Sequence, residues 1–142
     1  MKTFNKSVYL AGAISYYRNI GKPEQAENWR KEAQETLNYY DIKCFNPCDE
    51  SPICWDYAQD GLIKQNYYYL NNCDIVLVNL DAINDSIGTI WELSMAWRDH
   101  KPVIAFGTTS WLDNRPHMNS LIDMKFDTLS EALDYITSMY SI

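Results

Sequence analysis

The stretch Asp74-Ile75-Val76-Leu77-Val78-Asn79-Leu80 decides the fold. Its apolar side chains follow one another without the alternation of a half-exposed strand, so a strand buried on both faces is predicted here. Such strands are typical of parallel sheets that carry helices on each side.

Working outward from this strand, the chain alternates short apolar runs with stretches of helical periodicity. This alternation predicts a three-layer α/β fold with a mostly parallel sheet. Ligands bind such sheets beyond the carboxyl ends of the strands, which places a site in segments 11–18 and 81–92. The other predicted strands are 7–11, 42–45, 101–106 and 125–127, and the predicted helices are 23–40, 55–70, 88–99, 117–123 and 130–139.

Length and charge limit the function classes. With 142 residues, the chain is expected to form a single domain over 1–142. Its formal net charge of −7 disfavours binding to a nucleic-acid polymer or an anionic membrane, which require basic surfaces. There is no apolar run of about 20 residues and no signal-peptide pattern, so a cytoplasmic protein is expected.

The four cysteines are expected to be reduced thiols in that compartment. Cys44, Cys48 and Cys54 could suggest zinc, but their spacing is not CxxC and no fourth ligand lies nearby in the sequence. We therefore expect no metal and no cofactor.

Glu92 is the residue best placed for chemistry. Ser86, Gly88 and Thr89 form a small polar turn before it, and we expect Glu92 in the first turn of a helix, where the dipole keeps it ionised. An ionised carboxylate beside a ligand site can attack an electrophilic carbon such as C1′ of a nucleoside, as in retaining glycosidases. The alternative is structural, because Thr89 to Glu92 also fits the S/T-x-x-E capping box.

Four segments together resemble the nucleoside 2-deoxyribosyltransferase family, which includes 2′-deoxynucleoside 5′-phosphate N-hydrolases. They are Val8-Tyr9-Leu10-Ala11-Gly12, the stretch 73–80, the stretch Ser86 to Ala96 and Lys101-Pro102-Val103-Ile104. The resemblance implies a flavodoxin-like fold with strand order 2-1-3-4-5 and cleavage of the N-glycosidic bond of a (deoxy)nucleoside or its 5′-monophosphate.

The resemblance also assigns roles to residues. It makes Glu92 the nucleophile and Tyr9 the residue that holds its carboxylate. A second base would resolve the intermediate in a transferase, and water would do so in a hydrolase. The predicted substrate-binding residues are Gly12, Ile14, Ser15, Asn66, Asp85, Ser86, Gly88, Thr89 and Asn119.

Some positions depart from the family pattern. Asn66 replaces an Asp that contacts the sugar hydroxyl, and Asp85 is adjacent to Ser86, where transferases carry an Asp. Where the hydrolases use Ser and Arg to bind phosphate, this chain has Ala13 and Ser15, although Arg18 could reach back. The sequence therefore leaves open whether the substrate is a nucleoside or a nucleotide.

The family completes its site with a polar residue from a neighbouring subunit. Asn119 or Ser120 is the counterpart here, which predicts a homodimer or a higher homo-oligomer. Because Asn66 lacks the charge of an Asp, a protein that captures a nucleotide without turning it over is a second hypothesis. A structural domain in which Glu92 only caps a helix is the third.

Overall fold

A computed structural model describes residues 6–49 and 59–141 of the chain. Five strands form one parallel sheet in the order β2-β1-β3-β4-β5, which confirms the predicted class and strand order. The strands are β1 (Lys6–Ala11), β2 (Ile42–Phe45), β3 (Ile75–Asn79), β4 (Val103–Phe106) and β5 (Met124–Phe126).

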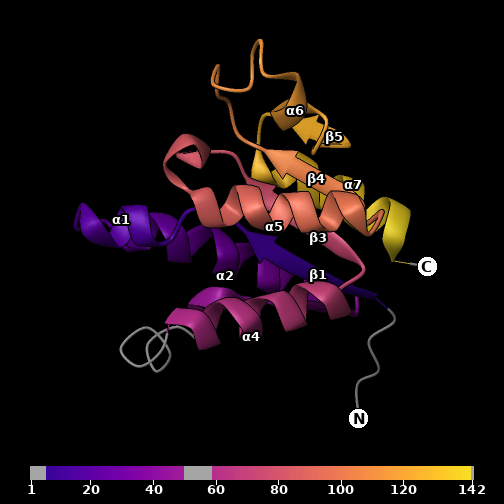
Figure 1. The fold of residues 1–142 in the computed structure, drawn as a ribbon. Helices are drawn as coiled ribbons and strands as arrows, with labels where there is room; N and C mark the ends of the chain where they lie inside the picture. Colours follow the sequence, from indigo (N-terminus) through magenta and orange to yellow (C-terminus); the bar gives the residue numbers. More distant parts are fainter. Residues whose placement is uncertain (1–5, 50–58, 142) are drawn as a thin grey trace.

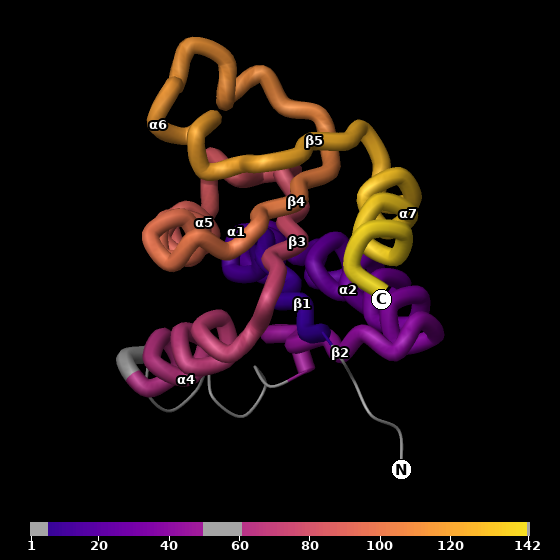
Figure 2. Tube along the Cα trace, turned by 90° about the vertical axis from the view of Figure 1, so that its right-hand side faces the viewer, coloured from indigo at the N-terminus to yellow at the C-terminus, as the bar shows by residue number. Residues whose placement is uncertain are grey.

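Helices cover both faces of the sheet. In Figure 2, α2 (Glu24–Tyr39) and α7 (Leu129–Tyr140) lie on one side, and α4 (Gln59–Asn72) and α5 (Ile87–Arg98) lie on the other. Two short helices, α1 (Ser15–Asn19) and α6 (Pro116–Asn119), and the 3-10 turn η1 (Ile83–Asp85) lie in the connections. Figure 1 shows α1 extending beyond the end of β1.

The central strands divide their side chains between two hydrophobic clusters. In β1, Val8 and Leu10 pack with α2 and α7, while Tyr9 and Ala11 pack on the α4 and α5 side. All five residues of β3 are buried, as its sequence predicts. The register pairs Leu10 with Leu77 and Ala11 with Val78, so the carboxyl ends of the two central strands lie side by side.

The boundaries differ from the predictions in ways that have physical causes. None of the side chains of α1 is buried, so this helix has no apolar period that a sequence pattern could reveal. The strand predicted from residue 101 begins at Val103, because Pro102 lacks the N–H that a ladder requires. The predicted start of the helix at 55–58 lies outside the described residues.

The cysteines and the helices add two observations about the described part of the chain. Cys44 and Cys73 are free thiols, and no group of three or more His, Cys, Asp or Glu residues there could hold a metal ion. Cys54 lies outside the described residues. No helix in the described ranges is both long enough and apolar enough to span a membrane.

Candidate active site

A cavity of about 260 Å³ opens beyond the carboxyl end of β1, between α1, α4 and α5. The predicted site residues meet there, apart from Tyr9 and Asn119. The described lining consists of Gly12, Ile14, Ser15, Tyr16, Leu62, Ile63, Asn66, Asp85, Ser86, Ile87, Gly88, Thr89 and Glu92.

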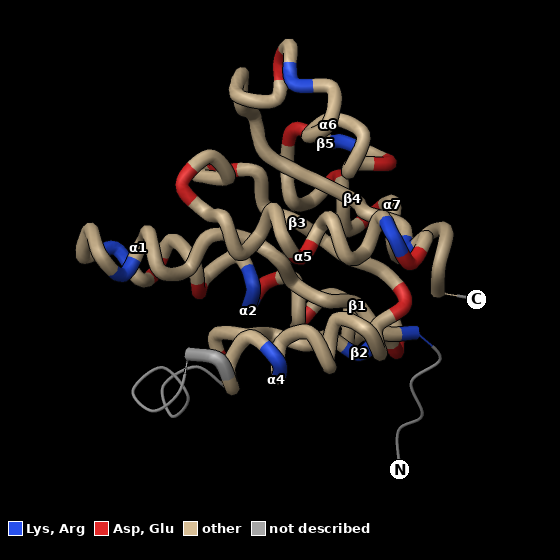
Figure 3. Tube along the Cα trace, in the orientation of Figure 1, with Lys and Arg blue, Asp and Glu red and all other residues tan. Residues whose placement is uncertain are grey.

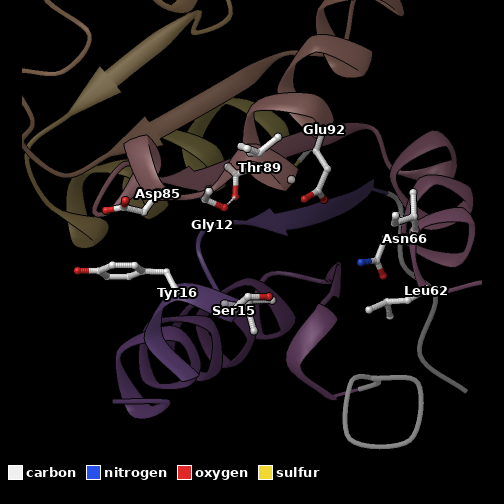
Figure 4. A pocket seen from close by; sticks show the side chains of 13 residues that line it. Gly12, Ser15, Tyr16, Leu62, Asn66, Asp85, Thr89 and Glu92 are labelled. Carbon is white, nitrogen blue, oxygen red and sulfur yellow. Dashed lines mark hydrogen bonds between the residues drawn. The ribbon is translucent and has the colours of Figure 1, made fainter. Parts of the chain in front are cut away.

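Glu92 does not cap its helix. Because α5 begins at Ile87 after Ser86, Glu92 lies in the second turn, and the predicted first-turn position and capping box are wrong. The Thr89 hydroxyl lies 2.6 Å from the Ser86 hydroxyl, and neither side chain caps a backbone N–H. Glu92 instead points into the cavity (Figure 4), and its Oε2 is buried without a hydrogen-bond partner.

Burial changes the charge of Glu92. It raises the pKa of the carboxyl group to about 7, although Tyr9 and Arg30 act in the opposite direction. The expectation that the helix dipole keeps Glu92 ionised is therefore wrong. The Glu92 carboxyl group therefore changes its protonation near neutral pH, and contacts to a ligand can shift its pKa.

Tyr9 supports Glu92 from behind the cavity wall. Its side chain has no exposure, and its ring stacks on Phe45 at a centroid distance of 5.2 Å. Burial raises the pKa of Tyr9 well above its usual value, and the negative charge of Glu92 raises it further. The Tyr9 hydroxyl stays protonated at neutral pH and faces Glu92, so it can donate a hydrogen bond to the Glu92 carboxylate, an interaction that lowers the pKa of Glu92 and raises that of Tyr9.

Asn66 contributes the third unpartnered group. Its Oδ1 is buried without a hydrogen bond, and the amide projects from α4 toward the side of the cavity that holds Glu92 (Figure 4). A buried polar atom left unpaired destabilises a protein by about 1–3 kcal/mol. In the described chain, the three side-chain atoms in this condition belong to Tyr9, Asn66 and Glu92, which marks this end of the cavity as a place for a polar ligand.

The family model described as "Nucleoside 2-deoxyribosyltransferase like" matches residues 5–109, which hold every strand of the sheet except β5. The chain belongs to this family. None of the curated proteins matches it in sequence.

Two solved structures share the fold. A 2-deoxyribosyltransferase from Bacillus psychrosaccharolyticus is 20% identical with a TM-score of 0.69, and the match covers 91% of each chain. A conserved protein from Enterococcus faecalis V583 is 16% identical with a TM-score of 0.72, over 94% of this chain and 98% of that one. At these sequence identities the similarity shows a shared fold only.

Two glycines line the cavity, and they differ in the space around them. A Cβ at Gly12 would lie 3.2 Å from Cζ2 of Trp29, so the neighbouring residues leave little room for a larger side chain at this position. A Cβ at Gly88 would meet no described atom within 4 Å. Gly88 therefore leaves space for a ligand, whereas Gly12 allows β1 to approach α2 closely.

The cavity is acidic. Its described lining contains Asp85 and Glu92 and no Lys, Arg or His. The undescribed residues 50–58 contain no basic residue in their sequence. Elsewhere in the described chain, Lys and Arg are dispersed over several elements and do not gather on one of them (Figure 3).

Arg18, the residue expected to reach back toward a phosphate, is not part of the described lining. Burial raises the pKa of the Cys48 thiol, and Arg30 and Arg18 act against this shift. The charge of Arg18 thus lowers the pKa of Cys48, and Cys48 does not line the cavity.

Asn119 lies on α6, away from the cavity of its own chain. Its Nδ2 donates to the Leu112 carbonyl at 3.2 Å, and the neighbouring Ser120 hydroxyl donates to the His117 carbonyl at 2.8 Å. A contribution of Asn119 to the site of a second copy remains a prediction.

Sequence reasoning missed several residues of the site. Leu62 and Ile63 lie four and three positions before Asn66, so helical spacing from Asn66 would have found them. Among the aromatic residues, whose rings could stack on a base, Tyr16 lines the cavity, whereas Trp55 and Tyr57 lie outside the described residues. Tyr17 and the run 67–69 do not line it.

Arg30 was also missed. It occupies an apolar helical stripe with Ala26, Ala33 and Leu37, and a charged residue in such a stripe was the available signal.

Proposed function

We propose that the protein cleaves the N-glycosidic bond of a nucleoside with Glu92 as the nucleophile. A Glu92 oxygen forms a bond to C1′ while the bond from C1′ to the base nitrogen breaks, and the base departs with that electron pair and takes up a proton. A second base or water then attacks C1′ and releases Glu92. The observation that carries this proposal is the unpartnered Oε2 of Glu92 in the same cavity as the unpartnered Oδ1 of Asn66.

The surrounding residues fit the charges that develop in this reaction. The Asn66 oxygen can accept a hydrogen bond from a sugar hydroxyl. The protonated Tyr9 hydroxyl can donate to the carboxylate of Glu92 and hold it in place. A ligand that excludes water strengthens these interactions, because the local dielectric constant falls.

The acidity of the cavity favours an uncharged nucleoside over a nucleoside monophosphate. A phosphate group would face Asp85 and Glu92 without a basic side chain from the described lining. Negative charges in the same cavity repel a phosphate and oppose its binding. Asp85 and Tyr16 lie at the other end of the cavity from Glu92 and Asn66 (Figure 4), where they can contact the rest of the ligand.

Base release tests this function. The protein is incubated with a panel of nucleosides and deoxynucleosides and with their 5′-monophosphates, with and without an acceptor base, and free bases are separated by chromatography. We expect release from nucleosides and slower release from monophosphates. Exchange of bases would define a transferase and release without an acceptor a hydrolase, whereas tight retention of an intact nucleotide would favour the capturing protein.

We also propose that a second copy of the chain covers α5. Ile87 lines the cavity and is 84% exposed, and Trp97 on the same helix is 59% exposed beside a groove shared with α6. A copy placed here would narrow the cavity mouth, which fits the family expectation for Asn119.

Sedimentation at micromolar concentration tests this assembly. We expect a dimer for the wild type, a monomer with reduced base release for Trp97→Glu, and a dimer for the control Tyr39→Glu, which changes an exposed aromatic on α2. A fully active wild-type monomer would contradict the assembly.

A further inference from the structure

Arg30 is a fully buried arginine on the opposite side of β1 from Glu92. Its side chain has no exposure, although it lies on α2 among apolar residues. Its guanidinium carbon lies 4.6 Å from the centroid of the Trp29 ring. Burial of an arginine is unfavourable unless its donors are paired and its charge is balanced.

The guanidinium holds the end of β1. Nη2 donates to the Gly12 carbonyl at 3.0 Å and Nε to the Leu10 carbonyl at 3.4 Å, while Nη1 donates to the Ala26 carbonyl at 2.7 Å. Gly12 lines the cavity, and a Cβ there would lie 3.4 Å from Nη2. Arg30 therefore contacts the back of the cavity wall without entering the cavity.

The three carbonyls that accept these hydrogen bonds carry no formal charge, so they do not neutralise the charge of Arg30. Among the described residues no carboxylate forms an ion pair with it. The titratable groups that act on it are, from the largest effect to the smallest, Cys48, which also forms a side-chain hydrogen bond with it, Glu92 from α5 and Tyr9 from β1. Burial lowers the pKa of Arg30, and these groups raise it. Of the three, Glu92 is the group that ionises near neutral pH.

We propose that Arg30 is a positioning residue of this site: from behind Gly12 it fixes the cavity wall at the end of β1 and stabilises the ionised form of Glu92. Arg30 touches no substrate in this role and acts through Gly12 and Glu92. The proposed coupling to Glu92 concerns the folded chain and needs no turnover, whereas an effect of Arg30 on rate rests on the proposed function.

Carboxyl ¹³C NMR tests the coupling without turnover. The Glu92 signal is assigned by its loss in Glu92→Gln and is titrated in the wild type, Arg30→Gln and Arg30→Lys. We expect the Glu92 midpoint, about 7 in the wild type, to rise by ~1 pH unit in Arg30→Gln and by less in Arg30→Lys, which keeps the charge.

Arg115→Gln is the matched control. Arg115 also stacks on a tryptophan, at 4.7 Å from the Trp111 centroid, and donates to a carbonyl, but it is exposed and does not line the cavity. We expect no change in the Glu92 midpoint. An unchanged midpoint in Arg30→Gln would overturn the proposal.

A second measurement covers the case in which Arg30→Gln does not fold. In the wild type, the Arg30 Nε–H resonance is expected to shift with pH through the same midpoint as Glu92, and this step should vanish in Glu92→Gln. An Arg30 Nε–H resonance with the same pH dependence in the wild type and in Glu92→Gln would overturn the coupling.

Kinetics separate the two proposals. If the wild type releases base and Arg30→Gln keeps its pH profile and kcat, the role of Arg30 in the reaction fails while the proposed function stands. If neither the wild type nor the Arg30 variants release base, but the Glu92 midpoint rises in Arg30→Gln as expected, the coupling stands and the proposed function fails.

Discussion

Buried polar groups are hydrogen-bonded on one side of β1 and lack hydrogen-bond partners on the other. On the α2 side, Arg30 is completely buried and its donors reach three backbone carbonyls. On the α4 and α5 side, Tyr9, Asn66 and Glu92 each hold a buried oxygen without a partner. Paired groups stabilise the chain by themselves, whereas unpaired groups stabilise it only when a ligand or water completes them. The paired groups on the α2 side therefore support the site, and the unpaired groups on the other side form it.

Glu92→Gln should break this contrast most strongly. Glutamine keeps the size of the side chain but removes the negative charge that attacks C1′, so base release should fall by on the order of 10⁴-fold or more. Chromatography of released bases measures the loss, and circular dichroism checks that the variant is folded. Glu35→Gln, an exposed substitution of the same type on α2, should retain wild-type turnover. Undiminished turnover in Glu92→Gln would remove the catalytic assignment.

The pH dependence should show the unpaired carboxyl directly. Burial raises the pKa of Glu92 to about 7, and only the ionised form attacks C1′. The value of kcat/KM for a neutral nucleoside should therefore rise with pH and level off above about 7, with a fall of ~50-fold between pH 7 and pH 5. A profile that is flat down to pH 5 would be incompatible with a protonated Glu92 in the free protein.

Asn66→Asp should sharpen the comparison by restoring a charge next to the sugar. A carboxylate accepts hydrogen bonds more strongly than an amide and stabilises the positive charge that develops on the sugar. Turnover should rise ~10-fold if the change recovers about 1.4 kcal/mol of the barrier.

Single-turnover rates and calorimetric titrations compare Asn66→Asp with Asn71→Asp, which adds the same charge at an exposed position of α4. Weaker binding with no gain in base release would favour a protein that captures its ligand without cleaving it.

The smallest expected effect is on stability. The pKa of Glu92 lies near 7 in the folded chain and near 4.5 as its ordinary value, so the unfolded chain loses this proton first as the pH rises. Wild-type stability should fall between these values and then level off, an effect absent from Glu92→Gln. Urea unfolding should show the variant gaining on the order of 2 kcal/mol relative to the wild type between pH 5 and pH 8. If the difference in unfolding free energy between Glu92→Gln and the wild type does not change with pH, then Glu92 does not have a raised pKa.

The fold and much of the cavity lining follow from local patterns in the sequence. The uninterrupted apolar run around Val76 requires burial on both faces, and the order of strands and helices then places the loops after β1 and β3 together. Gly12, Ser86, Gly88 and Glu92 could be predicted because they lie in those loops or just after them.

Other features depend on tertiary packing. The pattern from Thr89 to Glu92 fits a capping box, but the helix begins at Ile87, and one turn of difference moves Glu92 from a cap to a cavity wall. The pKa of Glu92 follows from its burial, which no local pattern reports. The role of Arg30 requires the carbonyls of Leu10 and Gly12, which lie 20 and 18 positions away in the chain.

The central claim is that Glu92 forms a bond to the sugar, and mass spectrometry of the quenched protein tests it most directly. The protein is mixed with an excess of a deoxynucleoside without an acceptor base, quenched rapidly in acid and digested. The account predicts a deoxyribosyl adduct on the peptide that contains Glu92, and no adduct in Glu92→Gln. An adduct on another residue, or base release by the wild type with an unmodified Glu92 peptide at every quench time, would contradict the account.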